Sequence, residues 1–266
     1  MKYLLIISFI FLSVFTGCEN EEIINPTTSY DELLVVQSEL IANSIFPGVR
    51  LTKTLPLGIP WDIQDAEVKD ATLYLRKNGV QIIPLHYSSE GIYEPLYNFT
   101  LQEGEVYELF GKRDKQSFYA KTIIPYTPII NSTTYNFSGK YLEATVRSFE
   151  NEVYTAIWII ASGNNISADN FYSVSVPEII SATSTINVRS ASLPDEYLAS
   201  TYDGRRAIQV FSFDRSFSDY FNTSTEGEAI NNPYVKGTGN TIWNIQGNKV
   251  IGMFIGYNKS GVLIVN

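Results

Sequence analysis

The sequence predicts an all-β protein, and three observations lead to that prediction. Apolar residues recur at every second position along many short stretches, as in strands with one buried face. Turn-forming pairs such as Pro47-Gly48 and Asn78-Gly79 separate these stretches at short intervals. One segment, Asp214–Phe221, has the three- and four-residue spacing of an amphipathic helix. We therefore expect β-rich layers with one or few short helices.

The first block, residues 30–126, is predicted to be a β-sandwich domain. Asn78-Gly79 favours a type I′ hairpin turn, and Pro56–Asp65 is predicted to be a loop that carries Trp61. About seven strands in about 95 residues are typical of an immunoglobulin-like or transthyretin-like sandwich. The predicted strands are Leu33–Ile41, Val49–Leu55, Ala71–Lys77, Val80–Ile83, Gly91–Phe99, Gly104–Gly111 and Gln116–Ile124.

The second block, residues 127–266, is predicted to be a further β-rich domain. Gly163–Asn170 is predicted to be a polar loop, and Asp214–Phe221 the helix. An aromatic stripe along that helix, formed by Phe213, Phe217, Tyr220 and Phe221, favours core packing over a binding surface. The predicted strands are Tyr141–Arg147, Val153–Ala161, Phe171–Val176, Thr183–Ser190, Arg205–Phe213, Thr241–Tyr257 and Val262–Val265.

Composition excludes several classes of function. The 266 residues contain 19 Lys and Arg against 28 Asp and Glu, a net charge of −9. This acidic balance argues against a nucleic-acid partner, because phosphate binding needs a basic face. The single Cys rules out an internal disulfide. One Cys and one His also make a Cys/His zinc site or a His-based catalytic triad very hard to build.

The N-terminus indicates export. Lys2 precedes an apolar stretch, Tyr3–Phe15, which has signal-peptide length and is shorter than a membrane-spanning helix needs to be. The alternative is an N-terminal membrane anchor helix. Phe15-Thr16-Gly17-Cys18 resembles a bacterial lipobox, so residues 1–17 would be removed between Gly17 and Cys18. The Cys18 thiol would then carry diacylglycerol, and two or more acyl chains (palmitate among them) would hold the protein stably in the lipid.

Residues 18–29 are predicted to tether this anchor to the folded body. Glu19, Glu21 and Glu22 follow the Cys directly, and such a run resembles the export signal of surface-exposed lipoproteins of Bacteroidota. The simpler interpretation is a solvated acidic tether. We expect an outer-membrane protein that faces the cell exterior, with the periplasmic face as the alternative.

The chemistry-bearing residues do not converge on a catalytic site in the sequence. His86, between Leu85 and Tyr87, favours a packed or surface histidine. Four acids share one segment without a Gly turn, which favours a solvated loop over an adventitious Ca²⁺ site: Asp62, Asp65, Glu67 and Asp70. A glycosidase needs two carboxylates that face each other across a cleft, and the sequence singles out no such pair among its 28 acids.

Two further motifs are interpreted as loops and turns. Gly237–Asn240 is Gly-rich, but no Lys-Ser/Thr follows it, so a phosphate-binding loop is not indicated. Asn-x-Ser/Thr triplets, which are not glycosylation sites in a bacterial lipoprotein, begin at Asn98, Asn131, Asn136, Asn165, Asn222 and Asn258. We therefore expect no enzyme, no catalytic residues, no cofactor and no metal.

Several short motifs follow one another in a characteristic order: Leu33–Ile41, Asp65–Tyr74, Gly91–Tyr93, Gly104–Leu109, Asn170–Tyr172, Tyr202–Arg205, Asn231–Pro233, Trp243–Asn248 and Gly252–Tyr257. Together with the lipobox, this order resembles a large Bacteroidota family of outer-membrane lipoproteins of unassigned biochemical function. The resemblance covers nearly the whole chain.

The resemblance implies an N-terminal sandwich like carboxypeptidase-regulatory or transthyretin-like modules, followed by a β-rich second domain. Genes of this family often lie beside TonB-dependent transporters, which implies an accessory role at such an outer-membrane barrel or another surface complex. The resemblance supplies no catalytic residues.

Two hypotheses of different classes follow. The first is a non-catalytic, lipid-anchored accessory or docking subunit of a TonB-dependent transporter or other outer-membrane barrel complex. The second is a surface glycan-binding or glycan-cleaving lipoprotein, because Trp61 and many Tyr side chains could stack on sugars. Core and interface packing of these aromatic residues is the simpler interpretation. A structural or adhesion protein of the cell surface is a third alternative.

Overall fold

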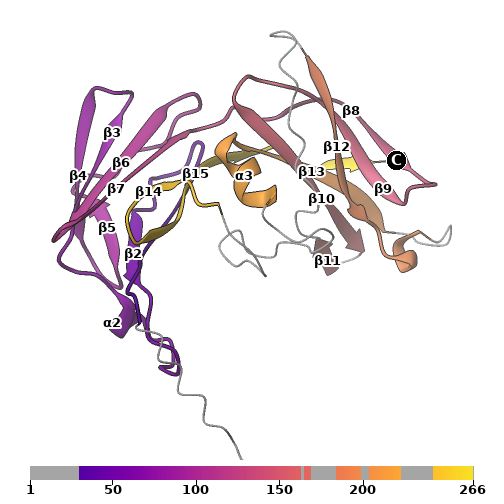
Figure 1. The fold of residues 1–266 in the computed structure, drawn as a ribbon. Coiled ribbons are helices and arrows are strands. Elements are labelled where there is room, and N and C mark those ends of the chain that lie inside the picture. The colour runs from indigo at the N-terminus through magenta and orange to yellow at the C-terminus, as the bar shows by residue number, and fades with distance from the viewer. Residues whose placement is uncertain (1–29, 163–164, 169–183, 199–203, 223–241, 266) are drawn as a thin grey trace, which may run out of the picture. The chain divides into compact units, whose positions relative to one another are not determined.

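The computed structural model describes residues 30–162, 165–168, 184–198, 204–222 and 242–265. These residues form mostly strands, with two short α-helices, which confirms the all-β prediction (Figure 1). The residues from Glu32 onward belong to one compact unit.

The predicted strands of the first block are all present, with ends that differ by a few residues. One turn of helix, α2 (Ile63–Ala66), begins at the end of the predicted loop, because the Asp62 carboxylate caps it by accepting the Gln64 N–H at 2.7 Å. The strands are β1 (Leu34–Ile41), β2 (Val49–Lys53), β3 (Thr72–Lys77), β4 (Gln81–Tyr87), β5 (Ile92–Pro95), β6 (Val106–Arg113) and β7 (Gln116–Ile123).

The second block contains the predicted helix as α3 (Ser216–Asn222) and a short 3₁₀ turn, η1 (Asp195–Tyr197). The predicted strand Phe171–Val176 lies outside the described residues. The strands are β8 (Ile129–Asn136), β9 (Tyr141–Arg147), β10 (Glu152–Ser162), β11 (Asn165–Ala168), β12 (Thr185–Ser192), β13 (Arg205–Asp214), β14 (Ile245–Gly247), β15 (Val250–Lys259) and β16 (Leu263–Val265).

Two of these strands correct the sequence-based prediction. β11 lies inside Gly163–Asn170, which we predicted to be a polar loop, and it pairs antiparallel with β10. β8 was not predicted, and it pairs antiparallel with β9. β11 is exposed at Ile166, Ser167 and Ala168, whereas β8 is partly buried, with Ile130 and Tyr135 packed against a core cluster. Both strands lie at the edge of a sheet, where backbone pairing does not require a continuous apolar face.

The strands form two sheets. β12, β9 and β8 make the smaller one. The larger sheet runs in the order β11-β10-β13-β15-β1-β2-β5-β4-β3-β6-β7-β14, with β16 paired to β13. β1 and β15 pair in parallel, with Val36 opposite Gly252, although more than 200 residues separate them along the chain.

Strands from the end of the chain complete the sheet of the first block. β14 pairs with β7, and β15 pairs with β1 on one side. β15 also meets β7, because the Gly256 N–H donates to the Thr122 hydroxyl at 2.8 Å. The division into domains at residues 126 and 127 stays a prediction, but the backbone hydrogen bonds of the first block include residues of the second.

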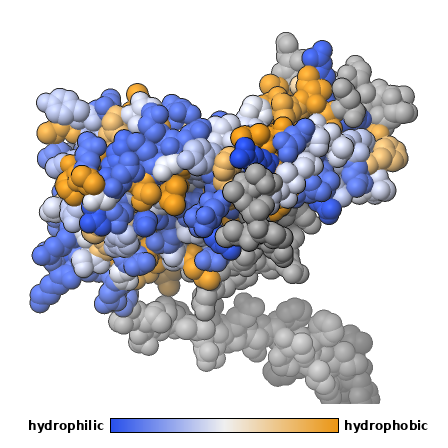
Figure 2. All heavy atoms as spheres, turned by 90° about the horizontal axis from the view of Figure 1, so that it is seen from above, coloured by the Kyte–Doolittle hydropathy of each residue, from blue (hydrophilic) through white to orange (hydrophobic). Residues whose placement is uncertain are grey.

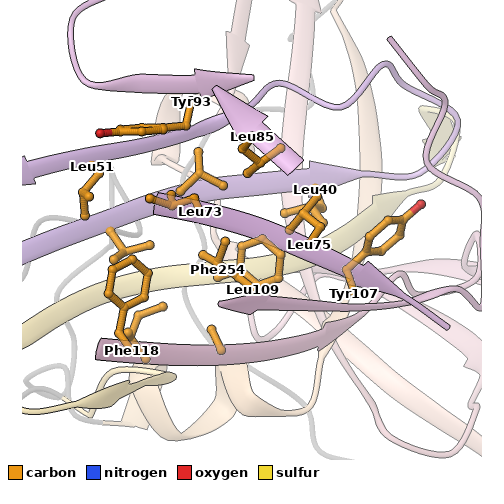
Figure 3. Close-up of a cluster of buried hydrophobic side chains, with 14 of the residues drawn as sticks. Leu40, Leu51, Leu73, Leu75, Leu85, Tyr93, Tyr107, Leu109, Phe118 and Phe254 are labelled. Carbon is orange, nitrogen blue, oxygen red and sulfur yellow. The ribbon is translucent and has the colours of Figure 1, made fainter. Parts of the chain in front are cut away.

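The first cluster of buried hydrophobic side chains contains residues of both blocks. Figure 3 shows Leu40, Leu73, Leu109 and Phe118 pointing toward one interior from four different strands, with Phe254 of β15 among them. Phe254 is fully buried. A side chain near the C-terminus therefore fills the core that the first block begins.

The aromatic stripe of α3 packs into a core cluster of its own. Phe217 and Tyr220 are buried, and the Phe213 and Phe217 rings stack with centroids 4.0 Å apart. Phe221 and the residues Met253 and Ile255 of β15 complete the cluster. The interpretation of this stripe as core packing is confirmed.

Candidate functional site

A groove opens on the outer side of β4, where the chain leaves β5. Pairing between the two strands covers only Leu85–Tyr87 and Tyr93–Pro95, and the chain beyond Pro95 forms the far wall. The groove has a volume of about 420 Å³. We call it the β4 groove; its lining residues are Lys77, Gln81, Ile82, Ile83, Pro84, His86, Pro95, Leu96, Tyr97, Asn98 and Phe99.

The alternation of β4 explains the apolar lining. Leu85 points inward and is buried in the first core cluster. The alternate positions Ile82, Pro84 and His86 are exposed on the outer side of the strand. An antiparallel strand usually carries polar residues on its solvent face, so two apolar side chains there are unusual.

The hairpin before β4 adds an apolar side chain beside the groove. Asn78 and Gly79 have φ of 51° and 73°, and the Val80 N–H donates to the Lys77 carbonyl at 3.1 Å, as the type I′ prediction requires. Lys77 of β3 pairs with Gln81 of β4, so Val80 lies outside the ladder of paired residues and is 85% exposed. Tyr97 is equally exposed.

The polar residues of the β4 groove do not form a reactive group. Lys77 forms an ion pair with Glu105 at 2.6 Å, and His86 lies exposed on β4. Within the described part of the chain, no group of three or more His, Cys, Asp and Glu side chains is placed to hold a metal ion. The arrangement suits the binding of apolar side chains from a partner.

A second surface consists of three aromatic side chains across β3, β6 and β7. The Tyr74 and Phe110 rings stack with centroids 4.8 Å apart and an interplanar angle of 9°. Phe110 and Tyr119 follow at 5.1 Å. We call these three half-buried rings the aromatic face. They border a hollow of about 590 Å³ that is also lined by Thr72, Gly111, Lys112, Ser117, Phe118, Gln246 and Gly247.

A charged network holds the aromatic face in place. Arg76 donates two hydrogen bonds of 2.7 Å to the Glu108 carboxylate, and the Tyr119 hydroxyl donates a third at 2.9 Å. The hydrogen bonds from Arg76 lower the pKa of Glu108, so this carboxylate stays ionised. The Arg76 guanidinium also lies 5.0 Å from the centroid of the Phe110 ring.

The face of the molecule drawn in Figure 2 carries both apolar and polar areas. Figure 2 shows one face on which hydrophobic residues form separate patches among hydrophilic ones. Isolated apolar residues are normal on a protein surface, whereas apolar residues that surround a groove indicate a binding site.

The structure separates the four acids that share one segment of the sequence. Asp62 caps α2, Glu67 pairs with Lys69 at 2.7 Å, and Asp70 pairs with Arg113 at 3.0 Å. Asp65 is exposed on α2. These carboxylates have different local partners, but the Glu67 side chain is only 7% exposed, so the prediction of a solvated loop is wrong at this residue.

The residues predicted to direct export lie outside the described residues, as does the Gly-rich loop Gly237–Asn240. The export residues are Gly17, Cys18, Glu19, Glu21 and Glu22. Among the described residues, no helix is long and apolar enough to cross a membrane.

Sequence reasoning did not identify the β4 groove or the aromatic face. The available signals were the adjacent apolar pairs Ile82-Ile83 and Leu96-Tyr97, which break the strand alternation. Tyr74, Phe110 and Tyr119 are far apart in sequence, and only the strand register brings them together.

A comparison with models of protein families gives a match over most of the chain. The family model of a domain of unknown function, DUF4249, matches residues 21–261. No curated protein matches the chain.

Proposed function

Because this chain belongs to the DUF4249 family, whose domain has no known function, we propose a role from the chain's own residues. In this proposal the protein is a non-catalytic lipoprotein of the outer membrane, anchored through acylated Cys18 and facing the cell exterior. It docks as an accessory subunit on an outer-membrane barrel complex, with a TonB-dependent transporter as the expected partner. The observation that carries the proposal is the β4 groove.

The β4 groove has the character of a protein-docking surface. Three of its lining side chains are apolar and exposed: Ile82, Leu96 and Tyr97. A contiguous apolar area of this kind on a soluble surface marks an interaction site, and tyrosine is enriched in such interfaces. Lys77, Gln81, His86 and Asn98 supply a polar rim, which is the usual surrounding of an apolar interface core.

The proposed anchor gives the β4 groove access to a membrane partner. The tether of residues 18–29, if extended, spans about 40 Å. This length would keep the folded body beside the membrane while it remains free to turn toward a neighbouring barrel. Tethering also raises the effective concentration of the partner, so a groove of modest size is sufficient for stable docking.

Affinity purification from detergent-solubilised membranes tests the docking. We expect the wild-type protein to co-purify with a barrel protein, and Ile82→Ser with Leu96→Ser and Tyr97→Ser to reduce the recovered barrel at least about tenfold, equivalent to about 1.4 kcal/mol. Ile166→Ser, which alters an exposed apolar side chain on β11, is the matched control. Recovery of the wild-type protein as a lone monomer would contradict the proposal.

Two substitutions test the location separately. Cys18→Ala should abolish lipid labelling and release the protein from the membrane fraction; retention would show that the N-terminal apolar segment is itself the anchor. Glu21→Ala with Glu22→Ala should preserve lipidation but reduce the protease accessibility of the protein on whole cells. Unchanged accessibility would remove the export role of these glutamates.

The aromatic face favours a second candidate function, binding of a surface glycan. Aromatic rings stack on the apolar faces of sugar rings, and the polar side chains that border the hollow, among them Thr72, Lys112 and Gln246, can bond hydroxyl groups. A glycan array should show binding that Phe110→Ala removes. Phe137→Ala, at an exposed ring outside the aromatic face, should leave it unchanged. No binding to any glycan would eliminate this candidate, and hydrolysis of a glycan would contradict the non-catalytic role.

A further inference from the structure

The loop between β2 and α2 presents an apolar surface distinct from the β4 groove. Residues 55–61 read Leu-Pro-Leu-Gly-Ile-Pro-Trp and contain no charged side chain. Leu57, Ile59 and Trp61 are 88%, 52% and 67% exposed. We call residues 55–61 the apolar loop.

The backbone holds these side chains outward. Gly58 has φ of 86°, and the Ile59 N–H donates to the Pro56 carbonyl at 3.2 Å, which closes a tight turn with Leu57 and Gly58 at its tip. Pro56 and Pro60 restrict the chain on either side of this turn. The apolar loop is therefore preorganised, and it would lose little conformational entropy on binding.

Both ends of the apolar loop are fixed to the core. β2 precedes it in the large sheet. On the other side, α2 ends at the buried Ala66, and the Val68 N–H donates to the Leu51 carbonyl at 3.2 Å. Figure 1 shows β2 and α2 at the same end of the first block. The exposed side chains project from a rigid base.

The apolar loop begins where the chain enters the compact unit. The Leu33 N–H donates to the Thr54 hydroxyl at 3.0 Å, and the Thr54 N–H donates to the Leu33 carbonyl at 2.9 Å. Glu32 also pairs with Lys53 at 3.5 Å. The last residues before β1 are thus bound to the residues that directly precede the apolar loop, so the chain enters β1 at the end of the body that carries this loop.

We propose that the apolar loop inserts into the surface of the bilayer in which the protein is anchored. The inference rests on the proposed lipid anchor at Cys18. Trp61 suits the polar–apolar boundary of a bilayer, and Leu57 and Ile59 suit the acyl region below it. The carboxylates Asp62 and Asp65 follow the loop, so its insertion depends on burial of the apolar side chains and not on attraction to anionic headgroups.

Insertion would orient the body on the membrane. A single lipid anchor leaves the body free to rotate, whereas a second contact at the apolar loop fixes which end faces the lipid. β3 begins soon after α2 and runs to the hairpin that carries Val80, so this hairpin lies at the opposite end of β3. The hairpin end of the β4 groove, with Lys77 and Gln81, would then lie further from the bilayer than the end with His86.

Tryptophan fluorescence of the full lipidated protein tests the insertion. The protein is mixed with phosphatidylcholine vesicles whose acyl chains are brominated, and flotation of the variant with Leu57→Ser and Ile59→Ser, which keeps Cys18, reports the anchor independently. We expect bromolipid to quench the Trp61 emission by about half or more. Trp61→Phe should remove the quenched component, because it removes the emitting group. Leu57→Ser with Ile59→Ser should retain Trp61 but reduce its quenching severalfold.

Val80→Ser is the matched control, because it alters an equally exposed apolar side chain at the opposite end of β3 and should not change the quenching. Flotation without quenching of Trp61 would overturn the insertion and leave the anchor standing. Quenching without flotation would support the insertion and contradict the anchor. Absence of both would overturn both proposals, and would leave a protein partner as the occupant of the apolar loop.

Discussion

Glu152, at the start of β10, is a buried acid with backbone and side-chain partners. Its carboxylate accepts the Tyr126 N–H at 2.8 Å and the Tyr154 hydroxyl at 2.7 Å. Burial, with a smaller contribution from the nearby Glu103 carboxylate, raises the pKa of Glu152 from 4.5 to about 7 against the effect of these hydrogen bonds. The folded protein therefore keeps Glu152 protonated below about pH 7.

This pKa predicts a pH-dependent stability. A carboxyl group whose folded-state pKa exceeds its unfolded value contributes stability that is fully present below pH 4.5 and is lost as the pH rises through about 7. The free energy of unfolding should therefore fall by about 3 kcal/mol from Glu152 alone between about pH 5 and about pH 8. Urea denaturation at a series of pH values measures this fall in the free energy of unfolding.

Glu152→Gln isolates this contribution, because the amide keeps the shape of the carboxyl group without the charge. The variant should be more stable than the wild type at pH 8 and should lose that part of the pH dependence. Glu94→Gln, at an exposed position of β5, should leave the pH profile unchanged. An identical pH profile for Glu152→Gln and the wild type would contradict the assignment.

At the scale of single elements, β15 is the strand with the tightest packing demands. It lies between β1 and β13, and it also approaches β7. At Gly252 the backbone has φ of 125°, and a Cβ atom there would lie 1.9 Å from the Val36 carbonyl oxygen of β1. The parallel pairing of β1 and β15 therefore depends on glycine at this position.

Gly252→Ala should separate β1 from β15 and destabilise the protein by about 3 kcal/mol or more, because both the backbone conformation and the steric contact are unfavourable. The urea midpoint measures this loss. Gly261→Ala is the control, since a Cβ atom there would meet nothing within 4 Å. Equal midpoints for the two variants would show that the strands do not pair as described.

At the scale of the whole molecule, the two predicted segments share structure on both sides of residue 126. The Asn258 amide of β15 donates to the Pro125 carbonyl at 3.2 Å, and the Ser212 hydroxyl of β13 donates to the Tyr126 carbonyl at 2.8 Å. The Asp214 carboxylate accepts the Ile123 N–H at 2.7 Å. The chain that joins the two segments is thus bound along its length by strands of the second.

We predict that residues 30–126 do not fold alone. This fragment lacks β15, so Leu34 and Val36 of β1 would lose their neighbours and the edge of β1 would be unpaired. Circular dichroism and urea denaturation of the fragment should show no cooperative transition, whereas residues 30–266 should show one. A cooperative transition of the fragment would instead support a division into independent domains.

The helix shows how much the local pattern could predict. The spacing of Phe217, Tyr220 and Phe221 predicted both the helix and its burial, because one turn of a helix brings such residues onto one face. The type I′ turn at Asn78-Gly79 was predictable for a similar reason, since both residues accept positive φ. β8 and β11 were not predictable, because their pairing depends on partners rather than on their own apolar residues.

The sequence by itself determined what local chemistry controls: the strands with a buried face, the hairpin turn, the helix, and the N-terminal motif from which the anchor at Cys18 is proposed. Only the tertiary structure decided that β15 pairs with β1, that Tyr74, Phe110 and Tyr119 form one face, and that the apolar loop lies where the chain enters β1. Alternation of apolar residues tells which side of a strand is buried, but it does not encode which strand lies next to it.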